Sequence, residues 1–174
     1  MMDRKYPIGQ FRQEGPIAEE QVKRWIEEIN QLPEQVTSLV RGLSESDLQH
    51  TYREGGWTIK QLVHHLADSH LNSFIRFKLA LTEENPIIKS YEEAEWAKLP
   101  DYDMPAQAAL NLLDSIHHKW VILLQSLTAE QLARTFRHPE SGEVSLKENI
   151  GIYAWHGKHH LAHIRLALKN EDEH

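Results

Sequence analysis

Apolar side chains recur at helical spacing in four long stretches of the chain. The stretches cover residues from about 17 to 42, from 58 to about 82, from 105 to about 127, and from about 145 to 168. In each stretch, apolar positions three or four residues apart line one face, which is typical of an amphipathic helix. The pattern therefore predicts an all-α protein built as a four-helix bundle.

Local signals indicate where these helices begin and end. Pro33 is predicted to interrupt the first helix, and Gly42 to stop it. Thr58 and Gln61 have the spacing of a capping box, so the second helix is expected to open there. Pro105 suits the first turn of the third helix.

The segments between the predicted helices are long. Residues 84–104 have no steady period, and a connection of this length in a compact domain often forms a lid or a binding loop. Residues 135–145 predict a small hairpin that turns at Ser141 and Gly142. Residues 1–16 resemble an irregular N-terminal arm, and residues 170–174 a frayed tail. We treat residues 1–174 as a single domain, with long connections after the first and third helices.

Residues 43–61 and 127–148 resemble each other. Each segment has a Leu-Ser or Leu-Thr pair, then a Thr-Tyr-Arg or Thr-Phe-Arg triplet, then a capping sequence before a long helix. The similarity has two explanations: capping chemistry repeats wherever helices begin, or the chain contains a two-fold pseudo-repeat.

Composition removes several classes of function. The net charge is −7 and no basic stripe is present, which argues against nucleic acid and anionic membranes as partners. The chain has no apolar run of about 18 residues and no secretion signal at its start, so a cytoplasmic location is expected. It also has no cysteine, which excludes disulfides, iron–sulfur clusters and thiol nucleophiles.

Histidine is the residue type that points to chemistry, with 12 in the chain. His156 and His160 on the fourth helix are one turn apart, so both rings can reach one ion. His159 and His163 have the same spacing, and spacing alone does not choose between the pairs. Either pair needs a third ligand from another helix.

A polar stripe on the second helix contains His65. It includes three candidates for contact with substrate or with a ligand ring, which are Asp68, Asn72 and Arg76. This stripe is either the solvent-exposed face of the helix or the lining of a polar cavity inside the bundle. If His65 points inward to a metal, most of the stripe is expected to point inward too, with Asp68 available as an outer carboxylate.

The remaining histidines have simpler interpretations. His64 and His70 fall on the apolar side of the second helix and are expected to pack in the core or against a partner. His117 and His118 of the third helix could supply a ligand, but a place at the surface is expected over that alternative. Three neutral imidazoles without a thiolate suit zinc or nickel and leave a coordination position open. The metalloprotease motif is absent, because no Glu follows His156, so its usual general base is missing.

Two segments, residues 56–70 and 155–164, resemble the two metal-binding helices of the DinB-like superfamily. Residues 6–9 and 72–78 resemble more specifically its YfiT branch, described as metal-dependent hydrolases. The resemblance extends over nearly the whole chain. It implies a four-helix bundle with an unusual connection order, one zinc or nickel ion per subunit, a homodimer and a cytoplasmic location.

The resemblance also implies a ligand set. The family ligand before the Leu-Ala-Asp run corresponds to His65, and the two ligands of the second motif correspond to His156 and His160. Three functions remain open. The first is a metal-dependent hydrolase, and the second is a thiol S-transferase of the bacillithiol type that uses a low-molecular-weight thiol cosubstrate. The third is a non-enzymatic metal-binding stress protein.

Overall fold

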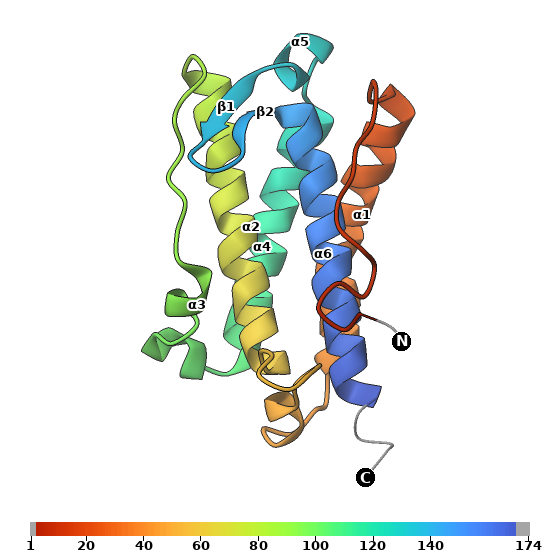
Figure 1. The fold of residues 1–174 in the computed structure, drawn as a ribbon, viewed down its shortest axis with the longest axis vertical. Helices are drawn as coiled ribbons and strands as arrows, with labels where there is room; N and C mark the ends of the chain where they lie inside the picture. The colour runs from red at the N-terminus through yellow and green to blue at the C-terminus, as the bar shows by residue number, and fades with distance from the viewer. Residues whose placement is uncertain (1–2, 170–174) are drawn as a thin grey trace.

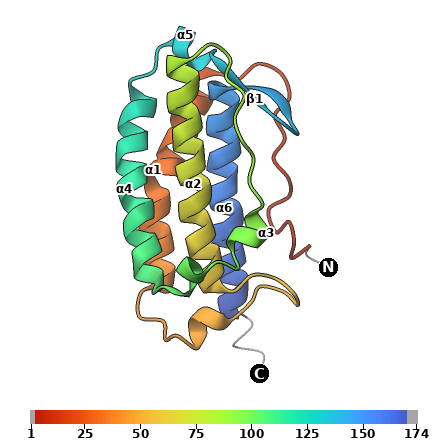
Figure 2. The same ribbon diagram turned by 90° about the vertical axis from the view of Figure 1, so that its left-hand side faces the viewer.

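A computed structural model gives the fold, and the structure describes residues 3–169. Four long helices form the bundle: α1 (Glu19–Val40), α2 (Ile59–Thr82), α4 (Ala106–Gln125) and α6 (Leu146–Lys169). Helices α1 and α6 run in one direction and α2 and α4 in the other (Figures 1 and 2). The prediction of an all-α four-helix bundle is confirmed. The predicted frayed tail, residues 170–174, lies outside the described residues.

The connections give the bundle its unusual order. Helix α1 packs against α4 and α6, and α2 packs against the same two helices, so α1 is diagonally opposite α2 and α4 is diagonally opposite α6. The connections after α1 and α4 therefore join helices that are diagonally opposite. The first contains a short 3-10 turn (Asp47–Gln49), and the other contains α5 (Ala129–Leu132), β1 (Thr135–His138) and β2 (Gly142–Ser145).

The connection after α2 runs along the outside of the bundle from one end to the other (Figure 1). It contains α3 (Glu93–Trp96) and a 3-10 turn (Pro100–Asp103). Because it returns the chain to the end where α2 begins, α2 and α4 are parallel neighbours. Within residues 3–169, no helix combines the length and apolar character that crossing a membrane requires.

The predicted interruption at Pro33 is wrong, because α1 is one continuous helix with Pro33 buried inside it. Proline has no backbone N–H, so the Ile29 carbonyl one turn earlier lacks its usual helical donor. His117 of α4 takes that place, with Nδ1 donating to the Ile29 carbonyl oxygen at 2.7 Å. Tertiary contacts thus satisfy the group that the proline leaves unpaired.

The predicted capping box of Thr58 with Gln61 is present, Thr128 and Gln131 form a second one, and the predicted hairpin is formed by β1 and β2. The internal similarity extends to the backbone. The amide that begins α2 bonds to the His50 carbonyl at 3.0 Å, and the amide that begins α6 bonds to the Arg134 carbonyl at 2.9 Å. Shared hydrogen bonding beyond the caps favours a two-fold pseudo-repeat over repeated capping chemistry.

The apolar core is divided into two clusters along the bundle. One packs around Trp120 and Phe77 and the other around Leu62 and Leu113. A layer of buried histidines lies between them, contributed by α2, α4 and α6. The interior therefore contains a polar layer that its buried groups must satisfy with hydrogen bonds or a bound ion.

Candidate metal centre

Three histidines from two neighbouring helices converge in this layer. His65 comes from α2, and His156 and His160 come from α6 one turn apart. One ring nitrogen of each lies within 4.8 Å of the corresponding atoms of the other two. The Nε2 atoms of His65 and His156 are 3.2 Å apart. The three residues that the resemblance selects are thus brought together at one point between α2 and α6.

Burial keeps these rings neutral. His65 is 1% exposed and His160 is 8% exposed, while His156 is partly accessible. Removal from water lowers the pKa of His65 to about 3. The same cause places the pKa values of His156 and His160 well below the usual value for histidine. Neutral rings each offer one bare nitrogen, which is the form that binds a metal.

The alternative pair, His159 and His163, forms a different group with His160. All three residues of that group belong to α6, so no second helix contributes a ligand atom to it. His163 stacks on Tyr52 with ring centroids 3.9 Å apart, and its Nε2 donates to the Lys5 carbonyl at 3.2 Å. The rings of His159 and His163 thus meet the N-terminal arm and the connection after α1, and His65 completes only the group with His156 and His160.

Two further histidines are part of this layer. The prediction that His117 lies at the surface is wrong, since it is 2% exposed, whereas its neighbour His118 is exposed as predicted. His70 is fully buried, as its position on the apolar face indicated. His70 Nδ1 lies 2.8 Å from His117 Nε2, and His70 Nε2 lies 3.1 Å from His156 Nδ1.

A signal for the burial of His117 is present in the sequence. His117 occupies the same stripe of α4 as Leu113, Trp120 and Leu124, all of which are buried. A histidine at such a position belongs to the core face of the helix and needs polar partners there.

A small hollow of about 230 Å³ opens beside this cluster. His160 forms part of its wall, together with Trp57, whose ring lies 4.6 Å from that of His65. Lys5 and Arg53 are the charged residues other than histidine that line it. The hollow therefore connects solvent with the histidine cluster past a basic rim.

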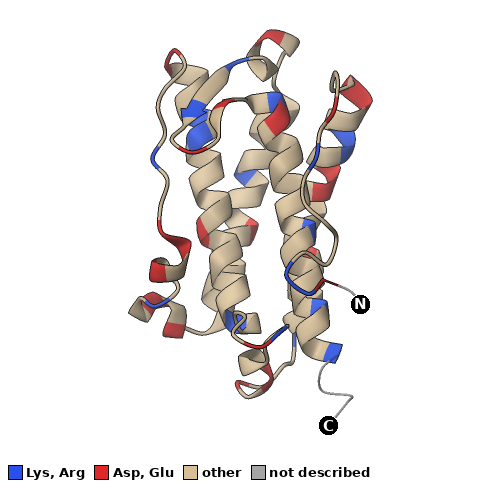
Figure 3. Cartoon of the chain, in the orientation of Figure 1, with Lys and Arg blue, Asp and Glu red and all other residues tan. Residues whose placement is uncertain are grey.

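The polar stripe of α2 contacts the connection that follows this helix. Tyr102 donates from its hydroxyl to the Asp68 carboxylate at 2.8 Å, and burial raises the pKa of Asp68. Arg76 donates to the Lys89 carbonyl at 3.5 Å. Asn72 bonds to the carbonyl of Asp68 in its own helix at 2.9 Å. The connection after α2 thus lies along this stripe, and Figure 3 shows its acidic residues gathered around α3.

None of these three candidates lines the hollow beside His160. Arg76 instead lines a polar hollow of about 390 Å³ together with Tyr91, Glu93 and Tyr153. Arg76 and His160 thus line separate hollows, and contact of Asn72 or Arg76 with a substrate stays a prediction. Sequence periodicity does not reveal that the long connection lies along this stripe.

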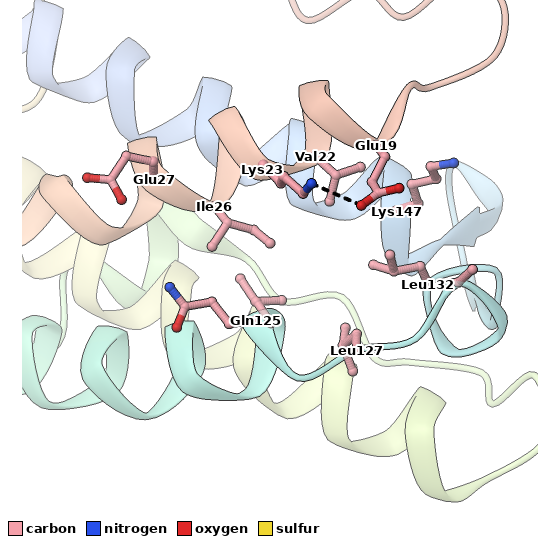
Figure 4. Close-up of a pocket in the computed structure, with 11 residues that line it drawn as sticks. Glu19, Val22, Lys23, Ile26, Glu27, Gln125, Leu127, Leu132 and Lys147 are labelled. Atoms are coloured by element: carbon pink, nitrogen blue, oxygen red, sulfur yellow. Dashed lines mark ion pairs between the residues drawn. The ribbon is translucent and has the colours of Figure 1, made fainter.

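A larger hollow of about 610 Å³ lies between α1 and α4, beside α5 (Figure 4). Its walls combine apolar residues such as Val22, Ile26 and Leu132 with charged ones, and Lys23 pairs with Glu19 at 3.0 Å. No histidine lines it. Size alone therefore does not identify the reactive site in this protein.

Gly157, between two of the converging histidines, has a packing role. A Cβ at this position would lie 2.8 Å from Leu32 Cδ2 of α1. The glycine thus allows α6 to approach α1 closely at the level of the cluster.

Comparison with known proteins gives consistent matches over the whole chain. The model of the DinB superfamily matches residues 28–164. A protein of Oceanobacillus iheyensis, named "Putative metal-dependent hydrolase", is 52% identical over 171 residues, which cover 98% of this chain and 99% of that protein. A Bacillus cereus protein of the same name is 55% identical over 164 residues, covering 94% and 95% of the two chains.

Two solved structures share the fold. YfiT from Bacillus subtilis, described as "a probable metal-dependent hydrolase with an unusual four-helix bundle topology", superposes with a TM-score of 0.93. It is 41% identical, with 97% of this chain and 98% of that chain covered. The four-helix bundle protein TT2238 matches with a TM-score of 0.57 at 18% identity, a likeness of fold alone.

Proposed function

This chain belongs to the DinB superfamily, and from that membership we propose that it is a metal-dependent hydrolase whose single divalent ion is bound by His65, His156 and His160. The observation that carries the proposal is the convergence of three neutral ring nitrogens from α2 and α6 within 4.8 Å. The names of the similar proteins support the same class of activity.

The donor set fits such an ion. Two ring nitrogens that bind one tetrahedral zinc at about 2.0–2.1 Å lie roughly 3.3 Å apart, and Nε2 of His65 lies 3.2 Å from Nε2 of His156. Three imidazoles without thiolate favour zinc or nickel. Among residues 3–169, no fourth ligand side chain joins this group, which agrees with a coordination position left for a reactant.

A divalent ion in this position supplies Lewis acidity and lowers the pKa of a coordinated nucleophile. The chain itself supplies position and exclusion of water. The Trp57 ring packs against His65 and limits access from the hollow, and the cationic side chains of Lys5 and Arg53 suit a substrate with a negative group. Asp68 is held by Tyr102 beneath the long connection, so we assign no general base to it.

Metal binding by single-site variants tests this assignment. We expect His65→Ala, His156→Ala and His160→Ala each to weaken zinc or nickel binding by at least about 100-fold, because each loses one of three ligands. His159→Ala is the matched control, one residue from His160, and is expected to bind nearly as tightly as the wild type. Full loss in His159→Ala with normal binding in His156→Ala would assign the ion to the other histidine pair instead.

A thiol S-transferase is the second candidate, favoured by the basic rim of the hollow. Lys5 and Arg53 would attract an anionic low-molecular-weight thiol toward His160. Metal-loaded protein incubated with such a thiol and an electrophile, and in parallel with ester and amide panels, separates the two reactions. Turnover in neither panel despite tight metal binding would favour the non-enzymatic metal-binding protein.

A further inference from the structure

We propose that two backbone carbonyls, those of Ile29 and Lys5, determine which nitrogen of His156 and of His160 carries the proton, through chains of buried imidazoles. Both chains leave Nε2 of the ligand ring bare, and that of His156 faces Nε2 of His65. The consequence for metal binding rests on the ligand set proposed above, whereas the proton positions are a property of the metal-free protein.

The deep chain begins at the carbonyl that Pro33 leaves without a helical donor. A carbonyl oxygen only accepts, so His117 Nδ1, at 2.7 Å from Ile29 O, must carry a proton. A neutral imidazole has one N–H, so His117 Nε2 is bare and accepts from His70 Nδ1 at 2.8 Å. His70 Nε2 is then bare and accepts from His156 Nδ1 at 3.1 Å. The proton of His156 is thereby fixed on Nδ1, and its Nε2 faces His65.

The second chain is shorter and leads to the N-terminal arm. His163 Nε2 lies 3.2 Å from the Lys5 carbonyl and therefore carries its proton there. His163 Nδ1 is bare and accepts from His160 Nδ1 at 3.3 Å. The proton of His160 is thus also on Nδ1, and its Nε2 is bare. The two ligands from α6 reach the same tautomer by separate routes.

Reversing either chain carries a clear penalty. The opposite tautomers would place the lone pair of His117 against the Ile29 oxygen, and in each chain a carbonyl would lose its donor. His70 and His117 are 0% and 2% exposed, so water does not replace the lost bonds in the deep chain. A buried polar group without a partner loses its hydrogen bond to water and gains none in return, which strongly favours one arrangement.

No chain that leads to a backbone carbonyl fixes the proton of His65. Its Nδ1 is buried and has no hydrogen-bond partner among residues 3–169. Because Nε2 of His156 is bare, the contact between the two Nε2 atoms at 3.2 Å requires the proton of His65 to lie on Nε2 when no metal is bound. If His65 binds a metal through this atom, its proton moves from Nε2 to Nδ1. His65 is therefore the one ligand of the three that changes tautomer.

Nitrogen NMR of the ¹⁵N-histidine-labelled protein tests these assignments, first without metal and then during zinc titration. We expect Nδ1–H tautomers for His156 and His160 before any metal is added, and an Nε2–H tautomer for His65 that converts to Nδ1–H with zinc. An Nε2–H tautomer at His156 or His160 in the metal-free protein would overturn the proposal. Failure to bind zinc would instead contradict the proposed function and leave this first result standing.

Variants at His117, which does not contact the metal cluster directly, test the effect at a distance. His117→Leu breaks the deep chain and is expected to weaken zinc binding by about 10–100-fold, the usual range for lost outer partners of a ligand. His117→Gln preserves a donor for Ile29 and an acceptor for His70, so it is expected to restore most of the affinity. His118→Leu, on the exposed neighbour, is the control and should bind zinc as the wild type does.

Zinc affinity in a folded His117→Leu protein equal to that of the wild type would overturn the role of the deep chain. Equal losses in the Leu and Gln variants would also contradict it, since they would indicate a packing effect rather than a hydrogen-bonding one. If His117→Leu does not fold, the tautomers of the wild type still decide the question.

Discussion

The two imidazole chains end on the same kind of group but differ in how the protein builds them. The deep chain passes from Ile29 in α1 through His117 in α4 and His70 in α2 to His156 in α6, so it touches all four long helices. The second chain joins His160 and His163 of α6 to the Lys5 carbonyl of the arm. One proposed ligand, His156, therefore depends on assembly of the whole bundle, and the other, His160, on the docking of a terminal segment.

Acidification is expected to produce the largest effect on the free energy of unfolding. It acts mainly through the buried histidines of the deep chain and of the metal centre. Burial lowers the pKa of His117 to about 4 and that of His65 to about 3, and it holds those of His70, His156 and His160 well below the usual value. The unfolded chain, with histidine pKa values near 6.5, binds more protons than the folded one below that pH. Stability is therefore present above pH 6.5 and is lost as the pH falls toward 4.

The size of this loss follows from the number of rings. Each of these five histidines contributes a slope of about 1.4 kcal/mol per pH unit, roughly 7 kcal/mol per unit together, against a typical total of about 5–15 kcal/mol. His159 and His163, whose pKa values burial also lowers, add to this slope. We expect metal-free protein to unfold with a midpoint roughly between pH 4 and 6. Urea unfolding followed by circular dichroism at several pH values measures the slope. His117→Gln removes one ring and should reduce that slope by about 1.4 kcal/mol per pH unit. A free energy of unfolding that is constant from pH 7 to 5 would contradict the burial of neutral histidines.

The sequence predicts the parts of this design that depend on neighbouring residues. The four helices, the hairpin and the capping boxes at Thr58 and Thr128 all follow from local spacing, and the structure contains them. The choice of His156 with His160 over His159 with His163 needed the resemblance to a family, because both pairs have the same separation. Convergence with His65 depends on two helices meeting, which periodicity does not give.

The parts that were missed depend on contacts between distant residues. Pro33 suggests a break when only its own helix is considered, yet the ring of His117, 88 positions away from Ile29, satisfies the freed carbonyl. Asp68 lies on the same stripe as His65, yet its carboxylate accepts from Tyr102 of the connection after α2, a contact that helical spacing does not give. In each case a partner that sequence spacing does not identify decides the role of a polar group.

Replacing His117 or His163, the ring that bonds the backbone carbonyl in each chain, tests whether the buried chain affects zinc affinity more than the solvent-accessible one. We expect His163→Leu to weaken zinc binding by about 10-fold or less, which is the low end of the range for outer partners, while His117→Leu reaches the upper part. The reason is that His163 borders the solvent-connected hollow, where water can accept the proton of His160 Nδ1 in place of the lost ring. Calorimetric titration of both variants with zinc measures the difference. A larger loss in His163→Leu would reverse the comparison and make the arm the main determinant of affinity.

The smallest effect is expected at the start of the deep chain, where Pro33→Ala returns an N–H to the helix. The new amide would point at the Ile29 carbonyl, which already accepts from His117 and has two lone pairs to share. We expect helix α1 to become more stable, by no more than the intrinsic preference of about 3 kcal/mol for alanine over proline. Zinc affinity should fall only about two- to threefold, well below the 10–100-fold range for a lost outer partner, because His117 keeps its acceptor and only shares it.

Thermal unfolding and zinc titration of Pro33→Ala, with Glu34→Ala on the exposed side of the same turn as the control, separate these effects. A loss of affinity as large as that of His117→Leu would mean that the carbonyl does not serve two donors. Unchanged affinity at higher stability would mean that His117 alone secures the anchor, with the proline contributing nothing to it.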